Sequence, residues 1–202
     1  MIMVNEMLRR ETKRAELRER IITAAEAELI EKGLSGLKAR DITSRAGCAL
    51  GALYNVFDDL DMLVLELNSR TLADLGTTLS SSAPVGSSSG RQVLQALAAA
   101  YTDFARDHQH RWMALFEHRL PEGKYKPEEY RMEQIILIDA IVPSLQELWP
   151  EISKETLAMR ARTTFAAVHG VVLLSLQQQF VGIPLKDLKS EVGALVELLS
   201  RQ

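Results

Sequence analysis

Apolar residues recur at helical spacing along most of the chain. From Leu17 to Leu29 an apolar residue stands at every fourth position, Arg and Glu flank it, and Gly33 follows as a helix stop. This pattern predicts an amphipathic helix over about residues 9–32. Three further helices are predicted before residue 80, over about 38–45, 49–56 and 59–79.

A serine-rich segment, residues 80–90, interrupts the helical pattern. Eleven residues made of Ser, Gly, Ala, Pro and Val have the composition of a linker and cannot pack a core. The segment therefore marks the one clear boundary that the sequence indicates.

Helical spacing resumes after this segment and continues to the end of the chain. The period-2 alternation that is typical of strands is not sustained anywhere, which indicates an all-α fold of about nine helices. Pro143 is expected to kink one of these helices. The remaining helices are predicted over about 91–108, 110–120, 127–149 and 153–180, with a last apolar stripe from Leu185 to Leu199.

The composition is that of an ordinary soluble protein. Of 202 residues 47% are hydrophobic and 25% are charged, with a formal net charge of −3. The longest apolar run, 171–174, is far shorter than the roughly 20 residues of a membrane helix, and the polar Asn5 and Glu6 argue against a signal peptide. One cysteine, Cys48, fits a reducing compartment. We expect a cytoplasmic protein with no membrane partner.

Residues 38–57 have the pattern of a helix-turn-helix. Gly47 can form the tight turn between two short helices because glycine adopts positive φ without strain. Small residues in the second helix let it approach another surface closely, and Tyr54 and Asn55 can reach phosphates or base edges. An ordinary pair of short helices in a bundle fits the same spacing.

A wider set of residues surrounds this motif. It comprises Arg20, Ile21, Ile22, Ala24, Ala25, Gly33, Asp41, Ile42, Ala46, Gly47, Gly51, Ala52, Leu53, Tyr54, Phe57 and Leu63. In order and spacing this set resembles the amino-terminal DNA-binding signature of the tetracycline-repressor (TetR/AcrR-like) family. The resemblance implies a three-helix DNA-binding domain and a larger helical domain that binds a small ligand and dimerises. The corresponding boundaries are 1–57 for the reader, 59–79 for a connecting helix, 80–90 for the serine-rich loop and 91–202 for the ligand-binding and dimerisation domain.

The chain departs from the family pattern within the reader. Family members commonly carry Ser and Thr at the positions of Ala49 and Ala52, a polar or basic residue at Leu50, His at Val56 and Lys at Leu60. Each change removes a polar contact that DNA could use. A ligand-binding protein of this fold with weakened DNA recognition is therefore an alternative.

The charge is distributed unevenly along the chain. Residues 1–57 contain ten Lys and Arg against eight Asp and Glu, a net of +2, so the other 145 residues carry −5. A positive reader with a basic arm at Arg9, Arg10, Lys13 and Arg14 suits phosphate contact, although a solvated terminus has the same composition. The acidic run 58–61 would oppose DNA, or it caps the next helix.

Candidate DNA contacts follow from residue chemistry and from the resemblance. Arg40 matches a family position that often reaches the major groove, Ala49 and Leu50 suit a thymine methyl group, and Tyr54 and Lys38 suit phosphates. Specificity requires two copies and a near-palindromic operator. The complete DNA-binding set is Lys38, Arg40, Arg45, Ala49, Leu50, Gly51, Tyr54 and Asn55.

Aromatic residues and histidines are concentrated after residue 100, where they can line an apolar cavity for an apolar or aromatic effector. Each of them also fits an ordinary core position. The stretch 167–171, around His169, resembles a motif in one subgroup of the family, in which Trp commonly stands at the position of Val168. The candidate ligand-binding residues are Tyr101, Phe104, His108, Trp112, Met113, Phe116, Met132, Phe165 and His169.

Metal-binding and catalytic patterns are not evident. His108 and His110 do not share a helix face, Glu117-His118 lacks the second histidine of a zinc-protease helix, and no nucleophile elbow or phosphate loop occurs. We therefore expect no cofactor, no metal and no enzymatic activity. An all-helical enzyme that uses the carboxy-terminal cavity stays as a second alternative.

The last two predicted helices carry continuous apolar stripes. Such stripes can form a four-helix bundle with a second copy, or they can face the core of a single chain. We expect a homodimer. The sequence thus predicts a homodimeric repressor that binds a palindromic operator and is released by a small-molecule ligand.

Overall fold

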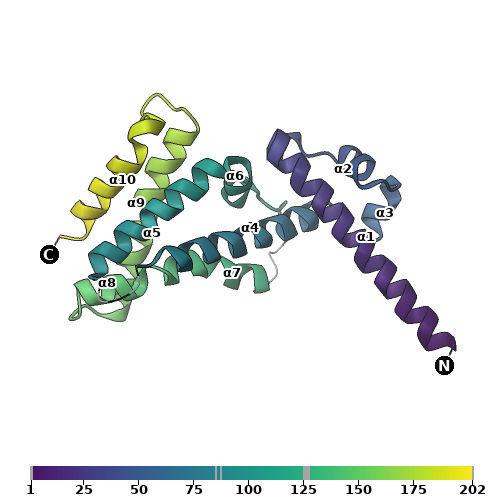
Figure 1. Cartoon of the computed structure of the whole chain (residues 1–202), viewed down its shortest axis with the longest axis horizontal. Helices are drawn as coiled ribbons and strands as arrows, with labels where there is room; N and C mark the ends of the chain where they lie inside the picture. Colours follow the sequence, from purple (N-terminus) through teal and green to yellow (C-terminus); the bar gives the residue numbers. More distant parts are fainter. Residues whose placement is uncertain (1, 85, 87, 125–127, 202) are drawn as a thin grey trace. The chain divides into compact units, whose positions relative to one another are not determined.

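All described secondary structure is helical, which confirms the predicted all-α fold class (Figure 1). The computed structural model describes residues 2–84, 86, 88–124 and 128–201, and the side chains of these except 2–8, 129 and 131–134. The elements are α1 (Ile2–Lys32), η1 (Leu34–Gly36), α2 (Ala39–Ala46), α3 (Leu50–Tyr54), α4 (Leu60–Ser82), α5 (Gly90–Asp107), α6 (Gln109–Glu117), α7 (Glu128–Asp139), α8 (Val142–Leu148), α9 (Lys154–Leu176) and α10 (Leu185–Leu199).

The chain forms two compact units. The first comprises Met1–Thr71 and His110–Lys126, and the second comprises Leu72–Gln109 and Pro127–Gln202. Helix α6 therefore belongs to the same unit as the helix-turn-helix, although it follows the serine-rich segment in sequence. Helix α4 contributes its first turns to one unit and its last turns to the other.

Three helix ends differ from the sequence-based expectation. Helix α4 continues to Ser82, into the serine-rich segment. The helix expected over 127–149 is instead two helices, α7 and α8, and Pro143 lies in the first turn of α8, where its missing N–H leaves no hydrogen bond unmade. Helix α9 ends at Leu176, and Gln178 beyond it has a left-handed backbone (φ 52°).

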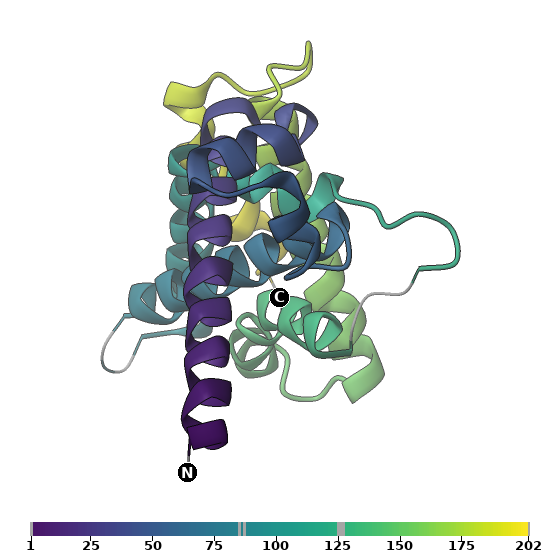
Figure 2. The ribbon, with the colours of Figure 1, turned by 90° about the vertical axis from the view of Figure 1, so that its right-hand side faces the viewer.

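The core of the first unit fixes the short helices on α1. Ile21 and Ile22 of α1, Ile42 of α2, Leu53 of α3 and Leu63 of α4 are each fully buried in one cluster, which Ala114 of α6 joins. Figures 1 and 2 show α2 and α3 beside the carboxy-terminal half of α1, while its amino-terminal turns extend beyond them. Burial of these side chains, at about 1.5–3 kcal/mol each, holds five short segments in one arrangement.

The second unit is built around α5. This helix packs against α8, α9 and α10, and fully buried residues include Val172, Leu188 and Val192. A capping box at the start of α5, in which Ser89 and Gln92 satisfy each other's backbone N–H groups, fixes its first turn. Within this unit Gly90 also donates its backbone N–H to the Glu147 carboxylate of α8 (2.9 Å).

Candidate functional site

The turn between α2 and α3 depends on Gly47. Its backbone is left-handed (φ 65°, ψ 43°), and its N–H donates to the Ser44 carbonyl (3.2 Å). The next N–H, that of Cys48, donates to the Thr43 carbonyl (3.0 Å), so the free carbonyls at the end of α2 are satisfied. The chain can then reverse direction within three residues and start α3.

Helix α3 has one buried and one exposed face. Leu53 and Phe57, just beyond the helix, lie in the core, while Leu50 is 39% exposed and Tyr54 is 49% exposed. The exposed residues Ala49, Leu50, Gly51, Tyr54 and Asn55 are called the reader face below. The predicted DNA-contacting residues of this helix thus lie on one surface.

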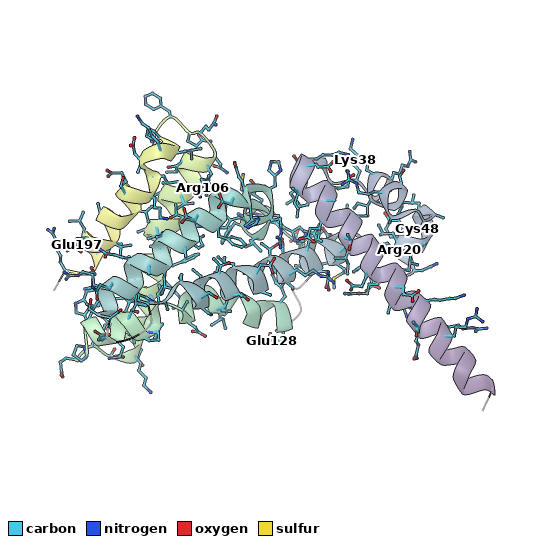
Figure 3. The ribbon with its side chains drawn as sticks, in the orientation of Figure 1. Arg20, Lys38, Cys48, Arg106, Glu128 and Glu197 are labelled. Carbon is cyan, nitrogen blue, oxygen red and sulfur yellow. The ribbon has the colours of Figure 1, made fainter. Side chains whose placement is uncertain are left out.

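Lys38 and Arg40 lie at the start of α2 and are exposed (Figure 3 labels Lys38). In the described part of the chain, neither side chain has an ion-pair partner. Their charges are therefore available to a phosphate or a base edge.

Arg45 has a different environment. Its Nε lies 2.9 Å from Glu28 Oε1, and its two terminal nitrogens each lie 2.7 Å from a Glu31 oxygen. Lys32 lies 2.5 Å from the second Glu28 oxygen and 3.1 Å from Asp41. The hydrogen bond from Arg45 holds the pKa of Glu31 below its usual value. Arg45 therefore joins α2 to α1, and local carboxylates already neutralise its charge.

Two arginines of α1 reach the end of α3. Arg14 donates to the Asn55 backbone carbonyl (3.3 Å), and the Arg18 guanidinium lies 5.2 Å from the centroid of the Phe57 ring. Arg18 also pairs with Glu66 of α4 (2.5 Å). The basic residues expected in an amino-terminal arm are thus part of the continuous helix α1.

The acidic run at the start of α4 is largely compensated. Asp59 caps the helix by accepting from the Met62 N–H (3.1 Å), and it also accepts from Lys124, which holds its pKa below the usual value. Lys124 lies 3.4 Å from Asp61 as well. The capping interpretation therefore accounts for Asp59.

Helix α6 is bound to α1 and α4 by polar contacts. His110 Nδ1 lies 2.7 Å from the Ile30 carbonyl, Arg111 pairs with Glu26 (3.2 Å), and Asn68 donates to the Ala114 carbonyl (3.3 Å). Three predicted ligand-binding residues, Trp112, Met113 and Phe116, lie on this helix and so belong to the first unit.

The second unit contains a small apolar cavity of about 40 Å³. It is lined by Leu79, Leu94, Leu97, Ala98, Tyr101, Leu137, Ala140, Ile141, Thr164, Phe165, Val168 and Val196. Tyr101 and Phe165 were predicted as ligand contacts. The aliphatic lining residues were not, because in sequence they have the same helical spacing as ordinary core residues.

Tyr101, Phe165 and His169 form a contact group beside the cavity. The Tyr101 hydroxyl lies 2.8 Å from His169 Nδ1, and the Phe165 ring stacks on the imidazole with centroids 5.6 Å apart. Tyr101 meets Phe165 edge-on at 5.7 Å. Burial lowers the pKa of His169 from its ordinary value of 6.5, so the ring is neutral at pH 7.

The other predicted ligand residues lie elsewhere. Phe104 is buried against the exposed His108, with ring centroids 4.7 Å apart, and neither lines the cavity. Met132 lies outside the described side chains. Searched over the described residues, the structure has no group of three His, Cys, Asp or Glu side chains arranged to hold a metal ion.

Comparison with known structures identifies similar folds. A protein of unknown function from Rhodococcus sp. RHA1 is 22% identical, with a TM-score of 0.73 over 92% of this chain and 96% of that chain. A TetR-like transcriptional regulator from Rhodococcus sp. RHA1 is 16% identical, with a TM-score of 0.62 over 90% and 93%. The fatty acid degradation regulator FadR from Bacillus halodurans is 16% identical, with a TM-score of 0.64 over 90% and 97%. These identities establish a shared fold.

Family comparison covers both units. No curated protein matches the sequence significantly. The family model described as bacterial regulatory proteins, tetR family, matches residues 21–67, and the one described as tetracyclin repressor-like, C-terminal domain, matches residues 94–199. The first match spans the helix-turn-helix, and the second covers more than half of the chain. The chain therefore belongs to the tetracycline-repressor family of transcriptional regulators.

Proposed function

We propose that this protein is a homodimeric, ligand-responsive transcriptional repressor that acts in the cytoplasm and binds a near-palindromic operator. The reader face of α3, flanked by the uncompensated cations Lys38 and Arg40, is the observation that carries the proposal. An exposed helix face with adjacent positive charge suits a major groove and its phosphates. Arg45 has an anchoring role in this proposal, because a base contact would require it to leave Glu28 and Glu31.

Helix α4 supports a route from ligand to reader. Its first turn carries Asp59 and Asp61, which contact Lys124, and its last part carries Leu79, which lines the cavity. An effector that displaces Leu79 acts on the same continuous helix that begins beside the helix-turn-helix. The effector shifts the population of reading states only by its difference in affinity between them.

Dimerisation through α9 and α10 is supported by their exposed apolar residues. Leu174 is 39% exposed and Leu198 is 57% exposed. By length and composition alone, α9 is the one described helix apolar enough to cross a membrane, but a core helix of a soluble protein meets the same criterion. A second copy of the chain would cover these side chains in a four-helix bundle.

A gel-shift titration against the DNA upstream of the protein's own gene tests the proposal. We expect a sequence-selective shift below micromolar protein, with an affinity that falls steeply as salt rises, because bound cations release counterions from DNA. A scrambled fragment of the same length is the control. Absence of a selective, salt-sensitive shift at micromolar protein would sink the regulator proposal.

The same titration separates the two alternatives. A ligand-binding protein that has lost DNA recognition would bind effector but give no selective shift. An enzyme that uses the cavity would consume its ligand, which chromatography of the incubated mixture detects. The regulator proposal is preferred because the family is one of transcriptional regulators.

A further inference from the structure

The cavity of the second unit contains no charge. Its lining is aliphatic or aromatic except for the hydroxyl groups of Tyr101 and Thr164, and no Lys, Arg, Asp or Glu is among the lining residues. A charged ligand would lose its hydration there without gaining a counter-charge, at a cost of several kcal/mol. The cavity therefore selects against ions.

Tyr101 supplies a polar group with a fixed position. Its hydroxyl lies 2.8 Å from His169 Nδ1, and the stacked Phe165 ring holds the imidazole in place. A phenol hydroxyl both donates and accepts, so a tyrosine that hydrogen-bonds a histidine can also hydrogen-bond a hydroxyl of a ligand. Because burial keeps His169 neutral, the pair presents a dipole and no net charge.

We infer that the effector is an uncharged, mainly apolar molecule with one hydroxyl group, and that Tyr101, positioned by His169, binds this hydroxyl. The inference rests on the proposed ligand response and specifies the chemistry of that site. Tyr101 is thus the residue that discriminates among apolar molecules of similar shape.

The small volume of the cavity adds a requirement. At about 40 Å³ it is smaller than a dry cavity that holds a benzene ring, which is about 150 Å³. A ring-sized effector must therefore move lining side chains, and Leu79 of α4 and Leu137 of α7 are flexible members of the wall. Displacement of Leu79 is the step that would connect occupancy to α4.

Four probes of similar size test the inference on the full-length protein by calorimetry. They are 4-methylphenol, p-xylene, 4-methylbenzoate and 4-methylbenzylammonium. We expect 4-methylphenol to bind about tenfold more tightly than p-xylene, as one added hydrogen bond predicts, and both ions to bind at least tenfold more weakly than p-xylene.

Isosteric variants locate the polar contact. Tyr101→Phe should bring the ratio of 4-methylphenol to p-xylene affinity close to one, with p-xylene affinity changed by less than about twofold. Thr164→Val removes the other hydroxyl of the wall and should keep the tenfold ratio, and Tyr54→Phe on the reader face should change neither affinity. Melting curves establish that each variant is folded.

Three outcomes would overturn the inference: an ion that binds as tightly as 4-methylphenol, a Tyr101→Phe variant that keeps the ratio, or no binding of any probe at millimolar concentration. The gel shift, performed on the same preparation, separates this failure from failure of the proposed function. A protein that binds its operator but no probe would refute only the ligand class. One that binds 4-methylphenol but no DNA would refute only the regulator.

Discussion

His118 and Asp61 lie 57 positions apart in sequence, and their side chains meet with Nε2 and Oδ1 3.1 Å apart. The imidazole is buried, and Lys124 approaches the same carboxylate from the same segment of chain. The start of α4 is thus held to residues 118–124 by charge. Of the three aspartates in this acidic run, Asp58 is the exposed one, and neither Lys124 nor His118 contacts it.

The first prediction separates the roles of these aspartates. Asp58→Asn should raise affinity for non-specific DNA at low salt by less than about tenfold, because it removes one exposed negative charge near the reader. Asp61→Asn should instead lower the melting temperature, because Lys124 and His118 lose a partner. Fluorescence anisotropy with labelled duplex and thermal melts measure the two effects, and equal DNA affinities of Asp58→Asn and the parent would contradict this assignment.

Arg40 and Lys38 should differ in what their loss changes. Arg40→Ala is expected to cost about 1–3 kcal/mol of operator binding and to relax the preference at one base pair, as loss of a bidentate base contact does. Lys38→Ala should weaken all sequences alike and reduce the salt slope by about one. Competition titrations with single-base operator variants measure both. Unaltered base preference in Arg40→Ala would show that it contacts only the backbone.

Gly47 and Gly51 provide a matched pair of alanine substitutions, because a Cβ at either position meets nothing within 4 Å in the protein. Gly47→Ala should destabilise the protein by about 1 kcal/mol, since its backbone is left-handed. Gly51→Ala should stabilise helix α3 by about 0.5–1 kcal/mol but weaken operator binding, since the methyl group stands on the reader face. Denaturant unfolding and gel shifts test this pair, and undiminished binding by Gly51→Ala would place DNA elsewhere.

His169 should make stability depend on pH. Its pKa is lowered in the folded protein, so the unfolded chain takes up a proton that the folded chain does not as pH falls below about 6.5. The free energy of unfolding should therefore decrease as pH falls from 6.5 towards the lowered pKa, and the full contribution is present above 6.5. His169→Gln should flatten this part of the curve. Parallel curves for the parent and His169→Gln would argue against a buried neutral imidazole.

Leu174→Glu and Leu198→Glu should convert a dimer to monomers. Both side chains are exposed in the single chain, so a carboxylate there leaves the fold intact but would be buried uncompensated between two copies. Sedimentation equilibrium measures the change, with Gln177→Glu, at an exposed position just beyond α9, as the control. A dimer that persists in both Leu variants would locate the interface on another surface.

The sequence by itself determined the helical fold class, the helix-turn-helix and the family. Helical spacing and glycine turns are local properties, so Gly33 and Gly47, both of positive φ, could be recognised from neighbouring residues alone. The reader face followed for the same reason, because the burial of Leu53 fixes which residues of a five-residue helix are exposed. The positions of helix ends were less predictable, since α7 and α8 separate where a single kinked helix was expected.

Only the tertiary structure decided which charges are compensated and which aromatic residues share a cavity. The pairing of Arg45 with Glu28 and Glu31, and of Lys124 with Asp59, joins residues whose proximity no local pattern encodes. The aliphatic cavity lining cannot be distinguished from core by periodicity, and Trp112, which has the same chemistry as a cavity residue, belongs to the other unit. Spacing along a helix determines which face a residue occupies, whereas the partner that covers this face depends on how distant segments pack.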